Sequence, residues 1–256
     1  MIELEGVSYR YPESEPVLKE VSFTVAEKEK VVLLGANGSG KTTLLRILNG
    51  LIFPNEGSYR YGSEPVTETR FKDRSWSRRF RREVVLLFQH PEAMLFNPTV
   101  YDEIAYGLRQ LGADDLDGQV RRWAARLGVE SHLTRPPFQL SGGEKQKVCL
   151  AALLALEPRV LLLDEPTASL DERVGGSFWD LLSELSRDAA VVIVSHDIGA
   201  VSRNVGSIAC LNRRLFMHPS RRLTPDMLES AYGESMETLA HDHAHHPAPP
   251  RGTRGS

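Results

Sequence analysis

One glycine-rich segment constrains the fold of this chain more than any other. Residues 35–43 read Gly-Ala-Asn-Gly-Ser-Gly-Lys-Thr-Thr, which fits the spacing G-x-x-x-x-G-K-[ST]. An apolar run at residues 31–34 precedes it, and a helical pattern of apolar residues at 44–48 follows. Glycines let backbone N–H groups turn towards phosphate oxygens, and the start of a helix adds partial positive charge. The sequence therefore predicts a nucleoside triphosphate site within a strand–loop–helix unit.

Two side chains at the end of this segment have specific expected chemistry. Lys41 is expected to reach the β- and γ-phosphates, and the Thr42 hydroxyl is expected to ligate Mg²⁺. The alternative is a flexible Gly/Ser turn before a helix, which the strand and helix patterns on either side make the weaker interpretation.

Length, charge and cysteine content narrow the class of protein. A chain of 256 residues can form one α/β domain with an inserted subdomain, and a net charge of −3 gives no overall attraction to nucleic acid or anionic lipid. Cys149 and Cys210 lie in apolar surroundings without metal-ligand spacing, which indicates a reducing compartment and inert buried thiols. Neither a signal peptide nor a membrane span is recognisable, so we expect a cytosolic protein that reaches the membrane only through a partner.

The strongest local charge is a basic stretch at residues 70–82. It holds seven arginines and lysines, namely Arg70, Lys72, Arg74, Arg78, Arg79, Arg81 and Arg82. We interpret it as a solvated surface segment; the alternative is a contact with phosphate or lipid.

Apolar periodicity predicts an α/β order of elements. Strand patterns are expected within residues 2–34, at 58–66, 84–88, 160–163, 191–194 and 207–216. Residues 91–157 contain helical patterns without strands, including a helix over 100–111 capped by Thr99 and one from 141 to 157. This arrangement predicts a helical subdomain inserted between two strand-rich regions.

Four of the apolar runs end in polar groups. These ends are Gly35, Gln89, the pair Asp164 and Glu165, and His196. Ligands of open parallel sheets bind at the carboxyl ends of the strands, so we expect all four ends to meet at one triphosphate.

Each polar group has an expected task and a plainer alternative. Asp164 suits the second Mg²⁺ anchor, and Glu165 is then free to orient or deprotonate the attacking water; the alternative is that both cap a turn. Gln89 is expected to contact Mg²⁺ and the water. His196 is expected to hydrogen-bond the γ-phosphate, against the alternative of a buried structural histidine.

A second glycine-rich helix start occurs at residues 140–144, Leu-Ser-Gly-Gly-Glu. Ser141 and Glu144 have the spacing of a capping box, while Gly142 and Gly143 leave a helix N-terminus bare for an anion. Because the first loop already cradles one triphosphate, we expect the second helix start to bind a nucleotide held by another subunit. This predicts a dimer with the nucleotide at its interface.

Together these motifs resemble the ATP-binding-cassette (ABC) ATPases over residues 2–216. The resemblance implies a P-loop NTPase (RecA-like) fold, with a mixed-sheet core at 1–89 and 158–216, an antiparallel β subdomain, a helical signature subdomain at 90–157, and a His/Pro-rich tail at 217–256. It implies ATP and Mg²⁺ as cofactors, Thr42, Gln89 and Asp164 at the metal, and Glu165, Gln89 and His196 in catalysis. It also implies a D-loop at 169–171 and a purine-stacking role for Tyr11, which spacing alone leaves equal to that of a sheet-edge aromatic. The implied nucleotide contacts are Tyr11, Gly35, Asn37, Gly38, Ser39, Gly40, Lys41, Thr42, Thr43, Gln89, Ser141, Gly142, Gly143 and Asp164.

Two parts of the sequence resemble particular kinds of ABC import ATPase. Residues 9–12 with 88–100 look like the energy-coupling-factor importers for cobalt, nickel and vitamins, whereas 210–215 and the histidine-rich tail resemble zinc and manganese uptake ATPases. We therefore expect an import ATPase at the cytoplasmic face of the inner membrane, most closely matching cobalt or nickel transport, as a homodimer or heterodimer docked on a permease near residues 89–100. The alternatives are a zinc, manganese or vitamin importer, a cassette acting on nucleic acid, and a small-molecule P-loop kinase.

Overall fold

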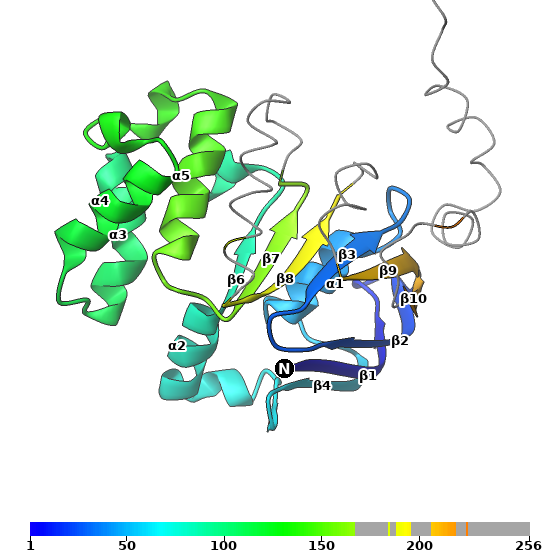
Figure 1. Cartoon of the computed structure of the whole chain (residues 1–256). Coiled ribbons are helices and arrows are strands. Elements are labelled where there is room, and N and C mark those ends of the chain that lie inside the picture. The colour runs from blue at the N-terminus through cyan, green and yellow to red at the C-terminus, as the bar shows by residue number, and fades with distance from the viewer. Residues whose placement is uncertain (167–183, 185–187, 196–205, 219–223, 225–256) are drawn as a thin grey trace, which may run out of the picture.

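The computed structural model describes residues 1–166, 184, 188–195, 206–218 and 224, whose strands form two sheets (Figure 1). The smaller sheet is antiparallel and has the order β2-β1-β4-β5. Its strands are β1 (Ile2–Tyr9), β2 (Leu18–Val25), β4 (Glu56–Tyr61) and β5 (Glu64–Pro65). Alternate side chains of β2 are buried, as the sequence pattern predicts for a sheet with one wet face.

The central sheet is mixed and has the order β10-β9-β3-β8-β7-β6. Its strands are β3 (Lys30–Leu34), β6 (Val84–Leu87), β7 (Val160–Asp164), β8 (Ala190–Val194), β9 (Ser207–Asn212) and β10 (Arg214–His218). Neighbouring strands from β9 to β6 are parallel, and β10 runs antiparallel to β9. All side chains of β6, β7 and β8 are buried, so these strands are apolar on both faces, as expected for β6.

The strand pattern expected at residues 207–216 is in fact two strands. Asn212 pairs with Arg214 across a tight turn, and Arg213 between them has a φ of 59°. Residues 208–211 of β9 are all buried, whereas residues 212–214 around the reversal are exposed.

Helix α1 (Lys41–Leu48) lies between the central sheet and the antiparallel sheet (Figure 1). Its buried leucines and Ile47 join one hydrophobic core with apolar side chains from both sheets. The helix ends at Leu48 with Asn49 as its C-cap, as the Asn-Gly pair predicts. This packing fixes the start of α1 at the carboxyl end of β3.

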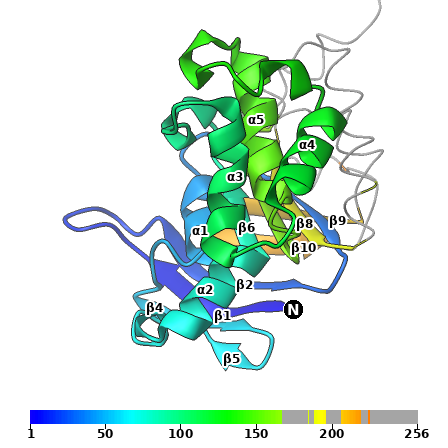
Figure 2. The same ribbon diagram turned by 90° about the vertical axis from the view of Figure 1, so that its left-hand side faces the viewer.

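Helices α3 (Val100–Leu111), α4 (Leu116–Arg126) and α5 (Gly142–Leu154) lie beside the β6 edge of the central sheet (Figure 1; Figure 2 views them from that side), and their buried side chains share a second core with apolar residues of the sheet. The predicted cap of α3 is confirmed, since the Thr99 hydroxyl accepts the Asp102 N–H at 3.1 Å. Short 3-10 turns at Pro91–Met94, Glu130–His132 and Pro137–Gln139 connect this region.

Helix α5 ends at Leu154, three residues before the predicted end at 157. Glu157, which precedes Pro158, has a φ of 51° and lies outside the helical region. A residue before proline is disfavoured in the helical conformation, so the chain leaves the helix early.

The basic stretch at 70–82 is more structured than a solvated segment. It forms a 3-10 turn (Arg70–Lys72) and helix α2 (Arg74–Glu83), whose N–H groups at Ser75 and Trp76 are capped by Asp73. Trp76 and Phe80 of α2 are buried and stack on each other at 5.1 Å, while the arginines face outward. The basic side chains are exposed to solvent, as predicted, whereas the helix and its two buried aromatic residues were not predicted.

We predict that neither cysteine reacts with alkylating reagents in the folded protein. Burial raises the pKa of the Cys149 thiol to about 12 and that of the Cys210 thiol to about 11. Since the thiolate is the reactive species, we expect no labelling by iodoacetamide at pH 8 and labelling of both residues in denaturant, measured by mass spectrometry. Rapid labelling of the native protein at either position would contradict this.

Candidate nucleotide-binding site

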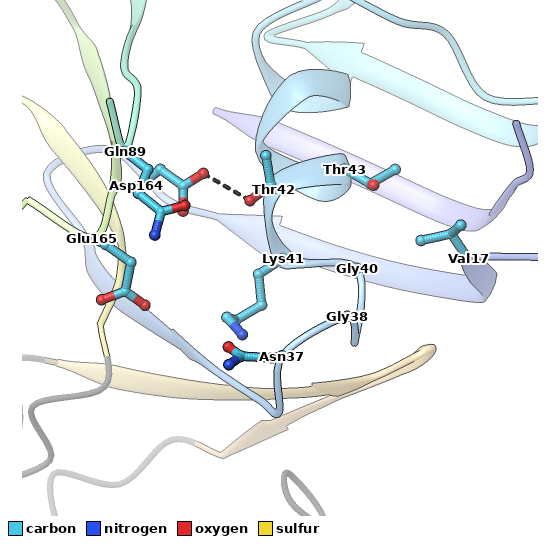
Figure 3. Close-up of a pocket in the computed structure, with 10 residues that line it drawn as sticks. All are labelled: Val17, Asn37, Gly38, Gly40, Lys41, Thr42, Thr43, Gln89, Asp164 and Glu165. Carbon is cyan, nitrogen blue, oxygen red and sulfur yellow. Dashed lines mark hydrogen bonds between the residues drawn. The ribbon is translucent and has the colours of Figure 1, made fainter. Parts of the chain in front are cut away.

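A pocket of about 360 Å³ lies at the carboxyl ends of β3, β6 and β7 (Figure 3). The residues that line it are Val17, Asn37, Gly38, Gly40, Lys41, Thr42, Thr43, Gln89, Asp164 and Glu165. The loop that follows β3, Gln89 after β6, and Asp164 and Glu165 at the end of β7 thus meet in one place, because parallel strands end at the same edge of the sheet.

The glycine positions of the loop reflect both conformation and close packing. Gly40, which precedes α1, has a φ of 106°, and a Cβ there would lie 2.8 Å from the Leu18 side chain. A Cβ on Gly35 would lie 2.2 Å from the Leu211 carbonyl oxygen. The first turn of α1 has neither a side-chain cap nor an acidic residue, so its N–H groups face the pocket as donors for an anion.

Lys41 holds the loop closed through the loop's own carbonyl groups. Its Nζ donates to the carbonyl oxygens of Gly35 at 2.7 Å and Ala36 at 2.9 Å. Burial lowers the pKa of Lys41, whereas the nearby Glu165 and Asp164 act to raise it. Lys41 is 8% exposed, and its side chain lines the pocket.

Thr42 and Asp164 join the loop to the central sheet. The Thr42 hydroxyl donates to Asp164 Oδ2 at 2.8 Å (Figure 3), and Asp164 is buried. Hydroxyl, carboxylate and amide oxygens are the ligands that Mg²⁺ prefers, and Mg²⁺ is commonly held by one or two such groups together with substrate phosphates. The residues present therefore fit a Mg²⁺ ion bound with a nucleotide.

Glu165 adopts a backbone conformation that is unusual for a glutamate. Its φ is 49°, and its N–H donates to the Val194 carbonyl oxygen at 3.0 Å. Non-glycine residues in this region cost about 1–3 kcal/mol and concentrate at functional sites. The conformation turns the carboxylate into the pocket near Lys41 (Figure 3).

Several predicted contacts lie beside the pocket. Gly35 packs against β9, and the Ser39 carbonyl accepts the Arg213 N–H at 3.2 Å, so both support the loop from behind. The Tyr11 hydroxyl lies 3.3 Å from Thr43 Oγ1, and the Tyr11 ring meets Tyr9 edge to face at 5.0 Å. Tyr11 is thus next to the loop but does not line the pocket.

Other predicted residues are elsewhere or outside the described structure. Ser141, Gly142 and Gly143 start α5 and do not line this pocket. The predicted capping box is confirmed there, since Ser141 Oγ accepts the Glu144 N–H at 3.3 Å. His196, the D-loop at 169–171 and the tail histidines lie outside the described residues.

Val17 is the pocket residue that the sequence analysis missed. It lies between β1 and β2, where the chain has turn residues and no phosphate motif. Its γ-carbon would lie 3.2 Å from a Cβ on Gly40, and that packing brings it to the pocket. A lone valine in a loop carries no sequence signal for such a contact.

A glycine loop that opens a helix at the end of parallel strand β3, tied by Thr42 to Asp164 on β7 of the same sheet, defines the class of P-loop nucleoside triphosphatases. Within that class, the family model described as "ABC transporter" matches residues 18–168, more than half of the chain. The chain belongs to the ABC transporter family, and its domain is an ABC ATPase.

Named relatives agree with this assignment. The chain is 41% identical over 215 residues to the nickel import ATP-binding protein NikO of Rhodobacter capsulatus, covering 82% of this chain and 84% of NikO. Its fold is similar to that of CbiO1 from Clostridium perfringens, part of the ABC transporter complex CbiONQ, with a TM-score of 0.75, 28% identity and 85% and 88% of the two chains covered. It is similar to the dimeric cassette MJ0796 bound to ADP and Pi, with a TM-score of 0.77, 26% identity and 88% and 100% covered.

Proposed function

We propose that this chain is the ATP-hydrolysing subunit of an importer for a transition-metal ion, with cobalt or nickel as the leading candidates. The observation that carries hydrolysis is the meeting of Lys41, the Thr42–Asp164 pair and Glu165 in one pocket. The similarity to NikO, a nickel import protein, supports import and the class of substrate. We assign the ATPase to residues 1–216, with a nucleotide-binding core at 1–89 and 158–216 and a helical subdomain at 90–157.

Each pocket residue has a proposed role in that reaction. Lys41 leaves the carbonyl groups of the loop and donates to the β- and γ-phosphates, together with the N–H groups of α1. Thr42, Asp164 and Gln89 hold Mg²⁺, which supplies charge neutralisation at the phosphates when bound. Glu165 accepts a hydrogen bond from the attacking water, orients it and takes its proton as the general base, and His196 donates to the γ-phosphate.

We further propose that the complete site forms between two cassettes. Ser141, Gly142 and Gly143 start α5 outside the pocket of their own chain, so they are available to the nucleotide of a second chain. The dimer of the similar cassette MJ0796 with ADP and Pi supports this proposal. Since only contacts across the dimer distinguish closed from open, ATP binding shifts the population towards the closed dimer.

A permease is proposed to dock beside residues 89–100. Phe96 is 67% exposed and Tyr106 of α3 is 45% exposed, and their rings meet edge to face at 5.0 Å. Tyr106 also borders a groove of about 530 Å³ whose wall includes the α2 arginines Arg74, Arg78, Arg81 and Arg82. An aromatic pair with a basic border is typical of a protein contact surface. Among the described residues, no helix has the length and apolarity needed to cross a membrane.

We expect Phe96→Ser to weaken binding of the permease by about tenfold or more, because exposed aromatic anchors carry much of the energy of an interface. The measurement is the amount of membrane subunit that co-purifies with tagged cassette, together with ATP hydrolysis by the cassette alone. Phe216→Ser is the matched control, since Phe216 is 53% exposed on β10. Equal co-purification by both variants would contradict the proposed docking surface.

The proposed function is tested by uptake in a strain that lacks this gene. Cells complemented with the wild type are expected to take up labelled nickel or cobalt, and cells complemented with Glu165→Gln are not. If the wild type restored uptake of zinc or manganese alone, the proposed cobalt or nickel substrate would be replaced by that metal. Salt-dependent binding of DNA or RNA by the purified protein would instead favour the nucleic-acid alternative, in which the arginines of α2 would contact phosphates.

A further inference from the structure

A histidine lies beside the second glycine-rich helix start. His132 ends the 3-10 turn Glu130–His132, and its Nε2 is 2.9 Å from Oε1 of Glu144 in the first turn of α5. The His132 side chain is 16% exposed and that of Glu144 is 35% exposed. The contact therefore joins two segments of the helical region in a partly buried place.

The Glu144 carboxylate uses both of its oxygens. Oε2 accepts the Ser141 N–H at 2.8 Å and the Ser141 hydroxyl at 2.7 Å, whereas within the described part of the chain Oε1 has His132 as its partner. The hydrogen bonds from Ser141, and then the nearby His132, lower the pKa of Glu144, so the carboxylate is anionic. A capping box forms equally with glutamine, so the cap itself does not require this charge.

Among the described residues, the His132 side chain has one polar contact, the one with Glu144. Its Nδ1 is buried, and no described group forms a hydrogen bond with it. A buried nitrogen without a hydrogen-bond partner lowers the stability of the turn, since its desolvation is not compensated. The favourable polar interaction of the His132 side chain is therefore the one between its Nε2 and Oε1 of Glu144.

An anionic side chain at an anion-binding helix start creates a conflict. A serine hydroxyl can donate one hydrogen bond, and in this structure the Ser141 hydroxyl donates it to Glu144 Oε2. For Ser141 to donate to a phosphate oxygen instead, Glu144 must stay satisfied without the hydroxyl and must not swing towards the phosphate, whose charge it repels. The Ser141 N–H on Oε2 and His132 on Oε1 meet both conditions.

We propose that His132 is a positioning residue for Ser141, holding the Glu144 carboxylate so that the Ser141 hydroxyl can turn to the nucleotide of the second cassette. This inference rests on the proposed dimeric ATPase. It explains how a glutamate at position 144 is compatible with phosphate binding at Ser141. It also means that His132 is required only while residue 144 carries a negative charge.

The test is a double-mutant comparison of His132→Ala in the Glu144 and Glu144→Gln backgrounds. With Glu144, we expect the ATP concentration for half-maximal hydrolysis to rise about tenfold, the size of effect given by one charge-assisted hydrogen bond. In the Glu144→Gln background we expect a change of less than about twofold, because an amide carries no charge to restrain. His132→Gln retains an N–H donor and is expected to recover part of the loss.

The controls separate this role from a structural one. Ser131→Ala, at an exposed position in the same turn, should leave the ATP concentration for half-maximal hydrolysis unchanged in both backgrounds. Thermal unfolding of each variant checks that it is folded. If His132→Ala unfolds, the comparison is made with His132→Gln and His132→Asn. An equal effect in both backgrounds would overturn the inference. Absence of ATP hydrolysis by the wild type would instead overturn the proposed function, and with it this inference.

Discussion

Glu165→Gln is expected to lower the rate of ATP hydrolysis by about 100-fold or more while leaving ATP binding intact. The substitution keeps the shape of the side chain and removes the carboxylate proposed to orient and deprotonate the attacking water, a role worth roughly 10²–10⁴ in rate. Because closure would no longer be followed by hydrolysis, the variant should accumulate as a dimer in the presence of ATP and Mg²⁺. Phosphate release and size-exclusion chromatography with light scattering measure the two effects.

The chain contains a matched control for this substitution. Glu157 also precedes a proline and also has a left-handed backbone, with a φ of 51° against 49° for Glu165, but it is exposed and lies outside the pocket. Glu157→Gln therefore reproduces the backbone context without the catalytic position, and it should hydrolyse ATP at the wild-type rate. Normal hydrolysis by Glu165→Gln would show that another group activates the water.

Lys41→Ala is expected to weaken ATP binding by about a hundredfold. The variant loses a donor to the phosphates, and hydrogen bonds to charged groups are worth about 1.5–3 kcal/mol each. It also removes the donor that the carbonyl groups of Gly35 and Ala36 share in the structure, so the empty loop should become less ordered. Isothermal titration calorimetry with a non-hydrolysable ATP analogue gives the affinity.

Lys72→Ala removes a lysine of equal charge from an exposed position and should bind ATP normally. Comparing the two variants separates the local contact from a change in net charge. An affinity of Lys41→Ala within about threefold of the wild type would contradict the phosphate-binding role, because that difference is less than half of one such hydrogen bond.

Much of the fold could be predicted because its signals are local. The strand–loop–helix unit around residues 35–43 is specified by glycines within a few residues of one another. Helix α3 has the predicted bounds because Thr99 caps it and Gly112, with a φ of 70°, ends it. The parallel strands β6, β7 and β8 are apolar on both faces and are therefore easy to recognise.

Helix α2 could not be predicted from its own residues because contacts outside the helix bury its apolar face. Its many arginines conceal an apolar face of only two residues, Trp76 and Phe80. That face is buried by an aromatic cluster that includes Phe71 and Tyr61 from neighbouring segments. Only the assembled protein shows that cluster.

Residue spacing was enough to predict the class of ligand, since the spacing of Gly35, Gly40, Lys41 and Thr42 is a local requirement for cradling phosphates. It also indicated that Gln89, Asp164 and Glu165 would join them, because parallel strands end at one edge. The tertiary structure decided how each group is held: the Thr42–Asp164 bond spans 122 residues, and the backbone of Glu165 is turned by its bond to β8. The His132–Glu144 contact likewise depends on packing between separate turns, which no local pattern of residues encodes.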